Sequence, residues 1–126
     1  MLSMYDKELV LDILHQILEA THKIQQRFGQ IETAADFTGS PFGMERLDSI
    51  CMLLIAIGES LKNIDKITDK ELFRNYPAID WKGAKGLRDI IAHQYFNVDA
   101  EEIFWVCEKH IPPLAETLGK MISDLA

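Results

Sequence analysis

One segment in the last third of the chain combines the residue types that phosphate chemistry needs. Lys82, Lys85 and Arg88 recur every three positions and place positive charge along one side of an expected helix. His93 follows, a side chain that changes charge near neutral pH, and Tyr95 adds a phenol that can donate a hydrogen bond or accept a modification. A cationic stripe of this kind can hold a phosphate while the histidine moves a proton.

The spacing of these residues limits how one helix can present them. At about 100° per residue, Arg88 and Tyr95 are nearly eclipsed, whereas His93 lies about 140° around the helix from Arg88. A single regular helix therefore cannot direct all three at one atom. Either the helix starts or bends within the motif, or two copies of the segment face each other, and we expect such a homodimer.

Cleavage of RNA without a metal ion would use these residue types. It needs a base for the ribose 2′-OH, an acid for the leaving 5′-oxygen and a cation for the charge on phosphorus. His93 can be base or acid, and Arg88 can clamp a phosphate with two parallel hydrogen bonds. Asp89 can orient either residue or pair with a lysine. Lys82 and Lys85 are expected either to guide RNA phosphates or to be solvated charges.

The spacing Arg88-x4-His93-x-Tyr95, with Asp89 after the arginine and the run HQYFNVD, resembles the HEPN superfamily, in particular the HepT-like toxins. The resemblance extends over the whole chain. It implies a metal-independent endoribonuclease that uses no cofactor, with Arg88 and His93 cleaving RNA at a homodimer cleft. Gln94 departs from the pattern, because many relatives have a glycine after the histidine.

The resemblance also implies a partner and a means of control. In that family the antitoxin is an MntA-like minimal nucleotidyltransferase, which transfers AMP from ATP onto the motif tyrosine. Tyr95 holds that position here and would become O-AMP-tyrosine in a type VII-like toxin–antitoxin pair. The added negative charge and bulk would block an RNA phosphate. The alternative is a non-catalytic helical partner of a nucleotidyltransferase.

Other interpretations of these residues remain open. Arg88 can form a surface ion pair with Glu59, and Tyr95 can pack against Phe96. His15 and His22 share one face of the first expected helix, but no Glu-x-x-His motif accompanies them, so neither a metal site nor a cofactor-binding four-helix bundle is favoured. Core or dimer packing explains most of the nearby aromatic residues better than RNA stacking does, namely Trp81, Phe96, Phe104 and Trp105.

The elements that must position the motif are predicted to be helices. Apolar residues recur at three- and four-residue steps over Met4–Phe28 and again over Pro41–Ile67. Gly29 is placed to end the first helix, and Ser40 can cap the second, with a proline in its first turn. The stretch between these helices loses the pattern and predicts a loop with room for one helical turn.

Shorter helices are expected in the second half. Thr68 and Glu71 fit a capping box for a short helix over residues 69–75. Asp80 can cap the motif helix, which is predicted to start at the next residue and to continue through Tyr95.

A further capping box, Asp99 with Glu102, predicts a fifth helix, which Pro112-Pro113 should interrupt and restart. Gly58 within an apolar stripe predicts a close helix crossing. No stretch alternates as a strand does. The fold class is therefore all-α, an up-and-down bundle of four main helices plus short helical segments.

Length and composition limit the number of domains and the classes of function. The 126 residues are 48% hydrophobic and are expected to form a single domain over residues 1–126. A net charge of −7 argues against a protein that coats nucleic acid, so RNA contact must be local. No apolar run could span a membrane, and Cys51 and Cys107 suggest two buried, reduced thiols, so we expect a cytoplasmic protein.

Overall fold

The computed structural model describes residues 4–94 and 96–126, and every regular element within these ranges is helical. The prediction of an all-α fold is confirmed. In chain order the elements are α1 (Met4–Phe28), α2 (Ala34–Thr38), α3 (Pro41–Ile67), η1 (Leu72–Asn75), α4 (Trp81–His93), α5 (Ala100–Trp105), η2 (Val106–His110) and α6 (Ile111–Leu125).

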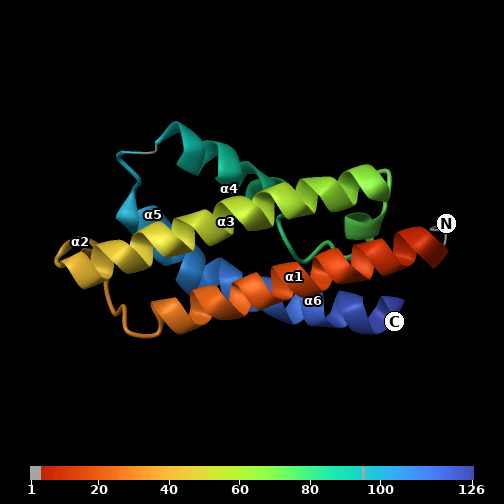
Figure 1. Ribbon diagram of the computed structural model, residues 1–126, viewed down its shortest axis with the longest axis horizontal. Helices are drawn as coiled ribbons and strands as arrows, with labels where there is room; N and C mark the ends of the chain where they lie inside the picture. The colour runs from red at the N-terminus through yellow and green to blue at the C-terminus, as the bar shows by residue number, and fades with distance from the viewer. Residues whose placement is uncertain (1–3, 95) are drawn as a thin grey trace.

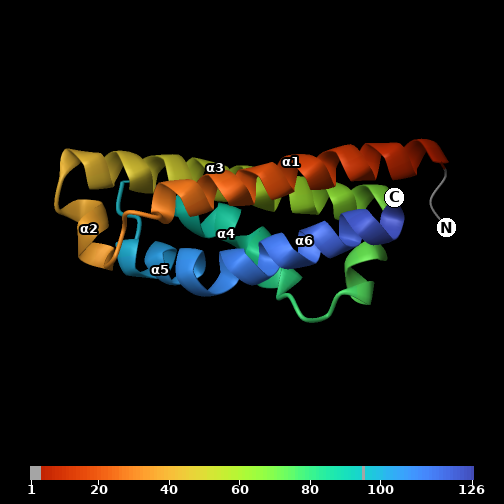
Figure 2. The same ribbon diagram turned by 90° about the horizontal axis from the view of Figure 1, so that it is seen from below.

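The long segments run alternately up and down the molecule (Figure 1). α1 is antiparallel to both α3 and α6 and packs on both of them, while α4 packs on α3. Figure 2 shows α1 and α3 along one side and α5 and α6 along the other, with α2 closing one end. None of the helices in the described ranges has the length and apolarity needed to cross a membrane.

The apolar stripes read from the sequence form the core. The side chains of Leu14 on α1, Leu61 on α3 and Leu118 on α6 are completely buried. Phe37 of α2 is buried as well and packs 6.2 Å from Phe28 between ring centroids, so the helical turn expected in the first loop seals one end of the core.

The helix starts predicted at Ser40, Asp80 and Asp99 are confirmed. The Ser40 hydroxyl accepts the Gly43 N–H at 3.0 Å at the start of α3, and the Asp80 carboxylate accepts the Gly83 N–H at 3.0 Å at the start of α4. Asp99 caps α5 in the same manner. These contacts satisfy amide groups that the first turn of a helix leaves without partners.

The predicted capping box of Thr68 and Glu71 is wrong. Thr68 instead ends α3, because its N–H and its hydroxyl both bond to the Ile64 carbonyl, at 2.9 and 2.8 Å. Asp69 and Lys70 then adopt left-handed φ angles of 53° and 62°, which a right-handed helix cannot contain. Helical structure resumes only with η1, so the expected helix is much shorter.

The prediction at Pro112-Pro113 is confirmed in part, because a last helix does start there, but the helical chain is not broken before it. The chain stays helical from α5 to α6 and widens into a π turn, η2. The prolines lack an N–H for the carbonyls one turn earlier, and the Ile111 N–H just before them reaches back to the Val106 carbonyl. Both prolines lie in the first turn of α6, where a missing N–H is tolerated.

Candidate functional site

The motif helix α4 lies close against α3 at Gly58. A Cβ atom at this position would lie 3.1 Å from the Arg88 Cβ and 3.3 Å from the Lys85 carbonyl oxygen. The close crossing predicted at Gly58 is confirmed. Arg88 and Lys85 therefore lie on the side of α4 that contacts α3.

Arg88 lies between two carboxylates. Its Nε is 2.8 Å from Oε1 of Glu59 on α3, and its Nη1 is 3.1 Å from Oδ1 of Asp89. The ion pair with Glu59 that the sequence left open is thus present. All three side chains are about half exposed, so these pairs add little stability.

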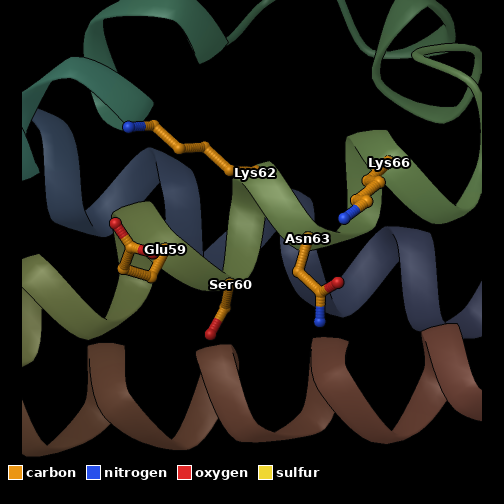
Figure 3. Close-up of a pocket in the computed structure, with 5 residues that line it drawn as sticks. All are labelled: Glu59, Ser60, Lys62, Asn63 and Lys66. Carbon is orange, nitrogen blue, oxygen red and sulfur yellow. The ribbon is translucent and has the colours of Figure 1, made fainter.

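Asp89 extends this arrangement to a second cation of α3. Its Oδ2 lies 3.6 Å from Lys62 Nζ. The hydrogen bond from Arg88, followed by the charge of Lys62, lowers the pKa of the Asp89 carboxyl below its ordinary value. Figure 3 shows Glu59 and Lys62 on α3, with the lysine reaching toward α4. We call Glu59, Lys62, Arg88 and Asp89 the α3–α4 ion network.

His93 is the last residue of α4, and its ring is fixed by one hydrogen bond. Nδ1 lies 2.6 Å from the Asp89 carbonyl oxygen. A carbonyl only accepts, so Nδ1 carries the hydrogen and Nε2 of the neutral ring holds the lone pair. In its neutral form, the exposed His93 therefore presents Nε2 as the acceptor.

Asp89 is the residue that joins the two motif side chains. Its carboxylate contacts Arg88 and its carbonyl contacts His93. Within residues 4–94 and 96–126, no hydrogen bond joins Arg88 to His93 directly. This agrees with their wide angular separation on one helix.

The end of α4 differs from the prediction that the helix continues through Tyr95. α4 ends at His93, and the Gln94 N–H is shared between the carbonyls of Ile90 and Ile91, both at 3.2 Å. Gln94 has a φ of −110°, so its backbone needs no glycine. Tyr95 itself lies outside the described residues.

The two lysines of the cationic stripe have different surroundings. Lys85 forms an ion pair with Asp65 of α3, and both side chains are largely buried. Lys82 is exposed and, in the part of the chain that the structure describes, has no ion pair. The charge of Lys85 is therefore balanced within the fold, and phosphate binding by either lysine stays a prediction.

Two of the aromatic side chains near the motif belong to the core, as expected. Trp81 stacks on Phe73 with ring centroids 4.2 Å apart, and Phe104 packs edge-on against Phe28 at 5.1 Å. Trp105 and Phe96 are exposed instead. Trp105 packs edge-on against His110, 4.3 Å away across the π turn.

A groove that sequence reasoning missed lies on the other flank of α4. It encloses about 470 Å³ between α4 and the α5–η2–α6 segment, and Leu87, Ile90, Trp105 and His110 are among its lining residues. On a regular helix, residues five apart such as Trp105 and His110 would point in different directions. The π turn brings them together, and Pro112-Pro113 was its sequence signal.

The described residues contain no group of three or more side chains suited to hold a metal ion. His15 and His22 are both exposed on α1. Sequence reasoning also missed that Lys62 and Asp65 of α3 pair with Asp89 and Lys85 of α4. The available signal was that both residues follow Gly58 at one and two helical turns.

The sequence is similar to a known protein family and to several individual proteins. A family model described as Ribonuclease HepT-like matches residues 17–121. Three candidate RNases of Methanocaldococcus jannaschii are similar to the chain: one is 34% identical over 77 residues, covering 61% of this chain and 63% of that protein. A second is 32% identical over 77 residues, covering 61% and 60%. The third is 27% identical over 121 residues, covering 94% and 92%.

The extent of these similarities differs. The matched segment spans less than two thirds of the length of the first two relatives, but nearly all of the third. No solved structure matches the chain.

Proposed function

The chain belongs to the Ribonuclease HepT-like family, and from this we propose that it is an endoribonuclease toxin that cleaves RNA without a metal ion. The observation that carries the proposal is the hydrogen bond between His93 Nδ1 and the Asp89 carbonyl, at 2.6 Å. It leaves Nε2 ready to accept a proton, on the helix that also presents Arg88.

The proposed reaction needs one proton removed and one supplied. His93 Nε2 takes the proton of a ribose 2′-OH as that oxygen attacks phosphorus, and the bond from phosphorus to the 5′-oxygen breaks. An imidazolium returns a proton to the leaving oxygen. The products are a 2′,3′-cyclic phosphate and a free 5′-OH, and Arg88 stabilises the negative charge on the phosphorus oxygens.

A homodimer would supply the second histidine. In one chain Arg88 turns toward Glu59 on α3, whereas His93 hydrogen-bonds to the α4 backbone at the end of that helix. Two α4 helices facing each other would place two His93 rings on one phosphate, one as base and one as acid. The exposed Ile90 on α4 is consistent with a second copy covering this helix.

Contact with RNA is proposed to stay local, in the cytoplasm. The net charge of −7 leaves no general attraction for RNA, so Lys82 and Lys85 of α4 are proposed to supply phosphate contacts beside Arg88. Lys82 is the more available of the two, because Lys85 is paired with Asp65.

The proposed regulator is an MntA-like minimal nucleotidyltransferase that transfers AMP to Tyr95. The two-residue spacing from His93 to Tyr95 supports this, because a phosphodiester there would repel an RNA phosphate. A Tyr95→Phe variant should remain toxic in the presence of the antitoxin and ATP. Full neutralisation of that variant through AMP transfer would contradict the proposal.

Induction of the protein in cells, with sequencing of new RNA ends, tests the nuclease itself. His93→Ala should lower the cleavage rate by about 10²–10⁴-fold, the usual contribution of a general acid or base. His22→Ala, an exposed histidine on α1, is the matched control and should cut as the wild type does. Equal cleavage by wild type and His93→Ala would refute the assignment. Absence of cleavage with retained AMP acceptance would favour the non-catalytic partner.

A further inference from the structure

A carboxylate outside the motif is bonded to the arginine that is proposed to bind phosphate. Glu59 belongs to α3, and its Oε1 lies 2.8 Å from Arg88 Nε. This contact joins residues 29 positions apart, so it reflects the fold and not the local sequence of α4. Figure 3 shows the Glu59 side chain on the face of α3 where Lys62 reaches toward α4.

The backbone on both sides of this contact is closely placed. Gly58 precedes Glu59, and a Cβ there would lie 3.1 Å from the Arg88 Cβ. The two helices therefore touch at the backbone from which the Glu59 and Arg88 side chains extend. Because helix packing fixes both backbones, the hydrogen bond at Nε determines the direction of the guanidinium.

The pattern of donors leaves the arginine able to bind phosphate. A guanidinium has five N–H donors. Glu59 takes the one on Nε and Asp89 takes one on Nη1, at 2.8 and 3.1 Å. One N–H on Nη1 and both on Nη2 remain, and these two terminal nitrogens form the fork that binds two phosphate oxygens in parallel.

The same contact weakens the attraction for RNA. In the α3–α4 ion network, Lys62 and Arg88 carry positive charge and Glu59 and Asp89 carry negative charge, so the network sums to zero. An approaching phosphate meets an oriented arginine in a neutral cluster. A site selected for affinity alone would not place a carboxylate on this arginine.

We infer that Glu59 is the positioning residue for Arg88, fixing the guanidinium so that its terminal N–H groups face the scissile phosphate. This inference rests on the proposed nuclease function. Glu59 touches neither RNA nor the reacting atoms and acts through Arg88. It raises the cleavage rate of bound RNA while lowering the affinity for RNA.

Three variants separate geometry from charge. Glu59→Gln keeps the shape, removes the charge and weakens the bond to Nε. We expect kcat to fall about 10-fold, KM for RNA to fall about threefold, and the slope of log affinity against log salt to steepen by about one. Glu59→Asp keeps the charge but is too short for the contact, so KM should stay near that of the wild type while kcat falls. Glu45→Gln, another exposed carboxylate of α3, should change neither.

An NMR measurement follows the contact without RNA cleavage. The Arg88 Nε–H signal of the free protein should be protected from exchange in the wild type and lose that protection in Glu59→Gln and Glu59→Asp. Unchanged kcat, KM and Nε–H exchange in Glu59→Gln would overturn the inference. So would parallel losses of kcat and melting temperature, which indicate a structural role.

The two proposals fail in different ways. If the wild type cuts RNA and Glu59→Gln cuts it equally well, only the positioning role fails. If the wild type cuts no RNA, the nuclease function fails and the positioning role fails with it, even where the Nε–H signal confirms the contact.

Discussion

α1 and α4 both pack on α3, but they do so by different means. The α1 and α3 helices bury continuous apolar stripes, and residues such as Leu14, Ile17 and Leu61 have almost no exposed surface. At α4, the inward-facing Ile91 is joined by a glycine contact and by ion pairs whose members are half exposed, apart from Lys85 with Asp65.

This difference means that the α1–α3 contact determines most of the stability, whereas the α3–α4 contact determines the geometry of the candidate site. Apolar burial is large and tolerant of small shifts in angle, so it holds the bundle together. Charged pairs at half-exposed positions contribute little stability and depend strongly on direction. The α3–α1 contact should therefore resist change, whereas small changes at the α3–α4 contact should alter chemistry first.

The largest expected effect on stability comes from the bundle core. Leu61→Ala removes a completely buried side chain from α3 and should lower the free energy of unfolding by about 2–5 kcal/mol, measured by urea denaturation. Met52→Ala on the same helix is the control, because Met52 is 71% exposed and its loss should change stability by no more than about 0.5 kcal/mol. Equal effects would mean that the core is wrongly assigned.

A smaller loss of stability with a larger loss of activity is expected at the crossing. Gly58→Val forces side-chain atoms into the space beside the Arg88 Cβ, so α4 must move away from α3. Unfolding should become easier by about 1–3 kcal/mol, and RNA cleavage should fall further than the fraction of folded protein explains. Gly119→Val is the control, since a Cβ there meets no atom within 4 Å. Retained cleavage by Gly58→Val would show that the close contact of α3 and α4 does not determine the geometry of the candidate site.

The buried ion pair of α4 should matter more than exposed ones. Asp65→Asn leaves Lys85 without its partner in a largely buried position and should cost about 1–2 kcal/mol in urea denaturation, below the full effect for completely buried pairs because the lysine keeps some solvent contact. Glu19→Gln breaks the exposed pair with Lys23 on α1 and should cost less than about 0.5 kcal/mol. A reversed order would assign the stability of α4 to other contacts.

The same contrast explains how far the sequence predicted the fold. The bounds of α1 and α3, and the caps at Ser40 and Asp80, follow from periodicity and from side chains that satisfy local amides. The errors occur where backbone geometry competes with local pattern. Thr68 bonds backward to α3 instead of forward, and the Pro112-Pro113 pair widens a helix instead of breaking it.

The candidate site was less accessible to prediction than the fold. Residue types, spacing and the family resemblance singled out Arg88 and His93 as candidates, and their spacing indicated that one regular helix does not bring them together. It did not identify Lys62 and Asp65 as partners of α4, because those contacts depend on the rotation of α3 against α4. The hydrogen bond between His93 and the Asp89 carbonyl depends on the orientation of the His93 side chain at the end of α4, which spacing does not determine.

The smallest expected change concerns the two thiols, which report whether the bundle opens. Cys51 and Cys107 are buried and unpaired, as the sequence predicted. Burial raises the pKa of Cys51 to about 11 and that of Cys107 to about 12. Only the thiolate reacts, so a thiol reagent at pH 8 should label the native protein at least about 100-fold more slowly than the urea-unfolded chain.

Comparing the rate of thiol labelling with the free energy of unfolding tests whether the α1–α3 and α3–α4 contacts are independent. Between pH 9 and 11 the thiols ionise in the unfolded chain but stay protonated in the native one, so the free energy of unfolding should fall as pH rises through that window. In Gly58→Val the rate at which Cys51 and Cys107 are labelled at pH 8 should rise only in proportion to the equilibrium constant for global unfolding of that variant. Faster labelling of either cysteine would mean that moving α4 also opens the bundle, and the division between a stabilising core and a separately placed motif helix would fail.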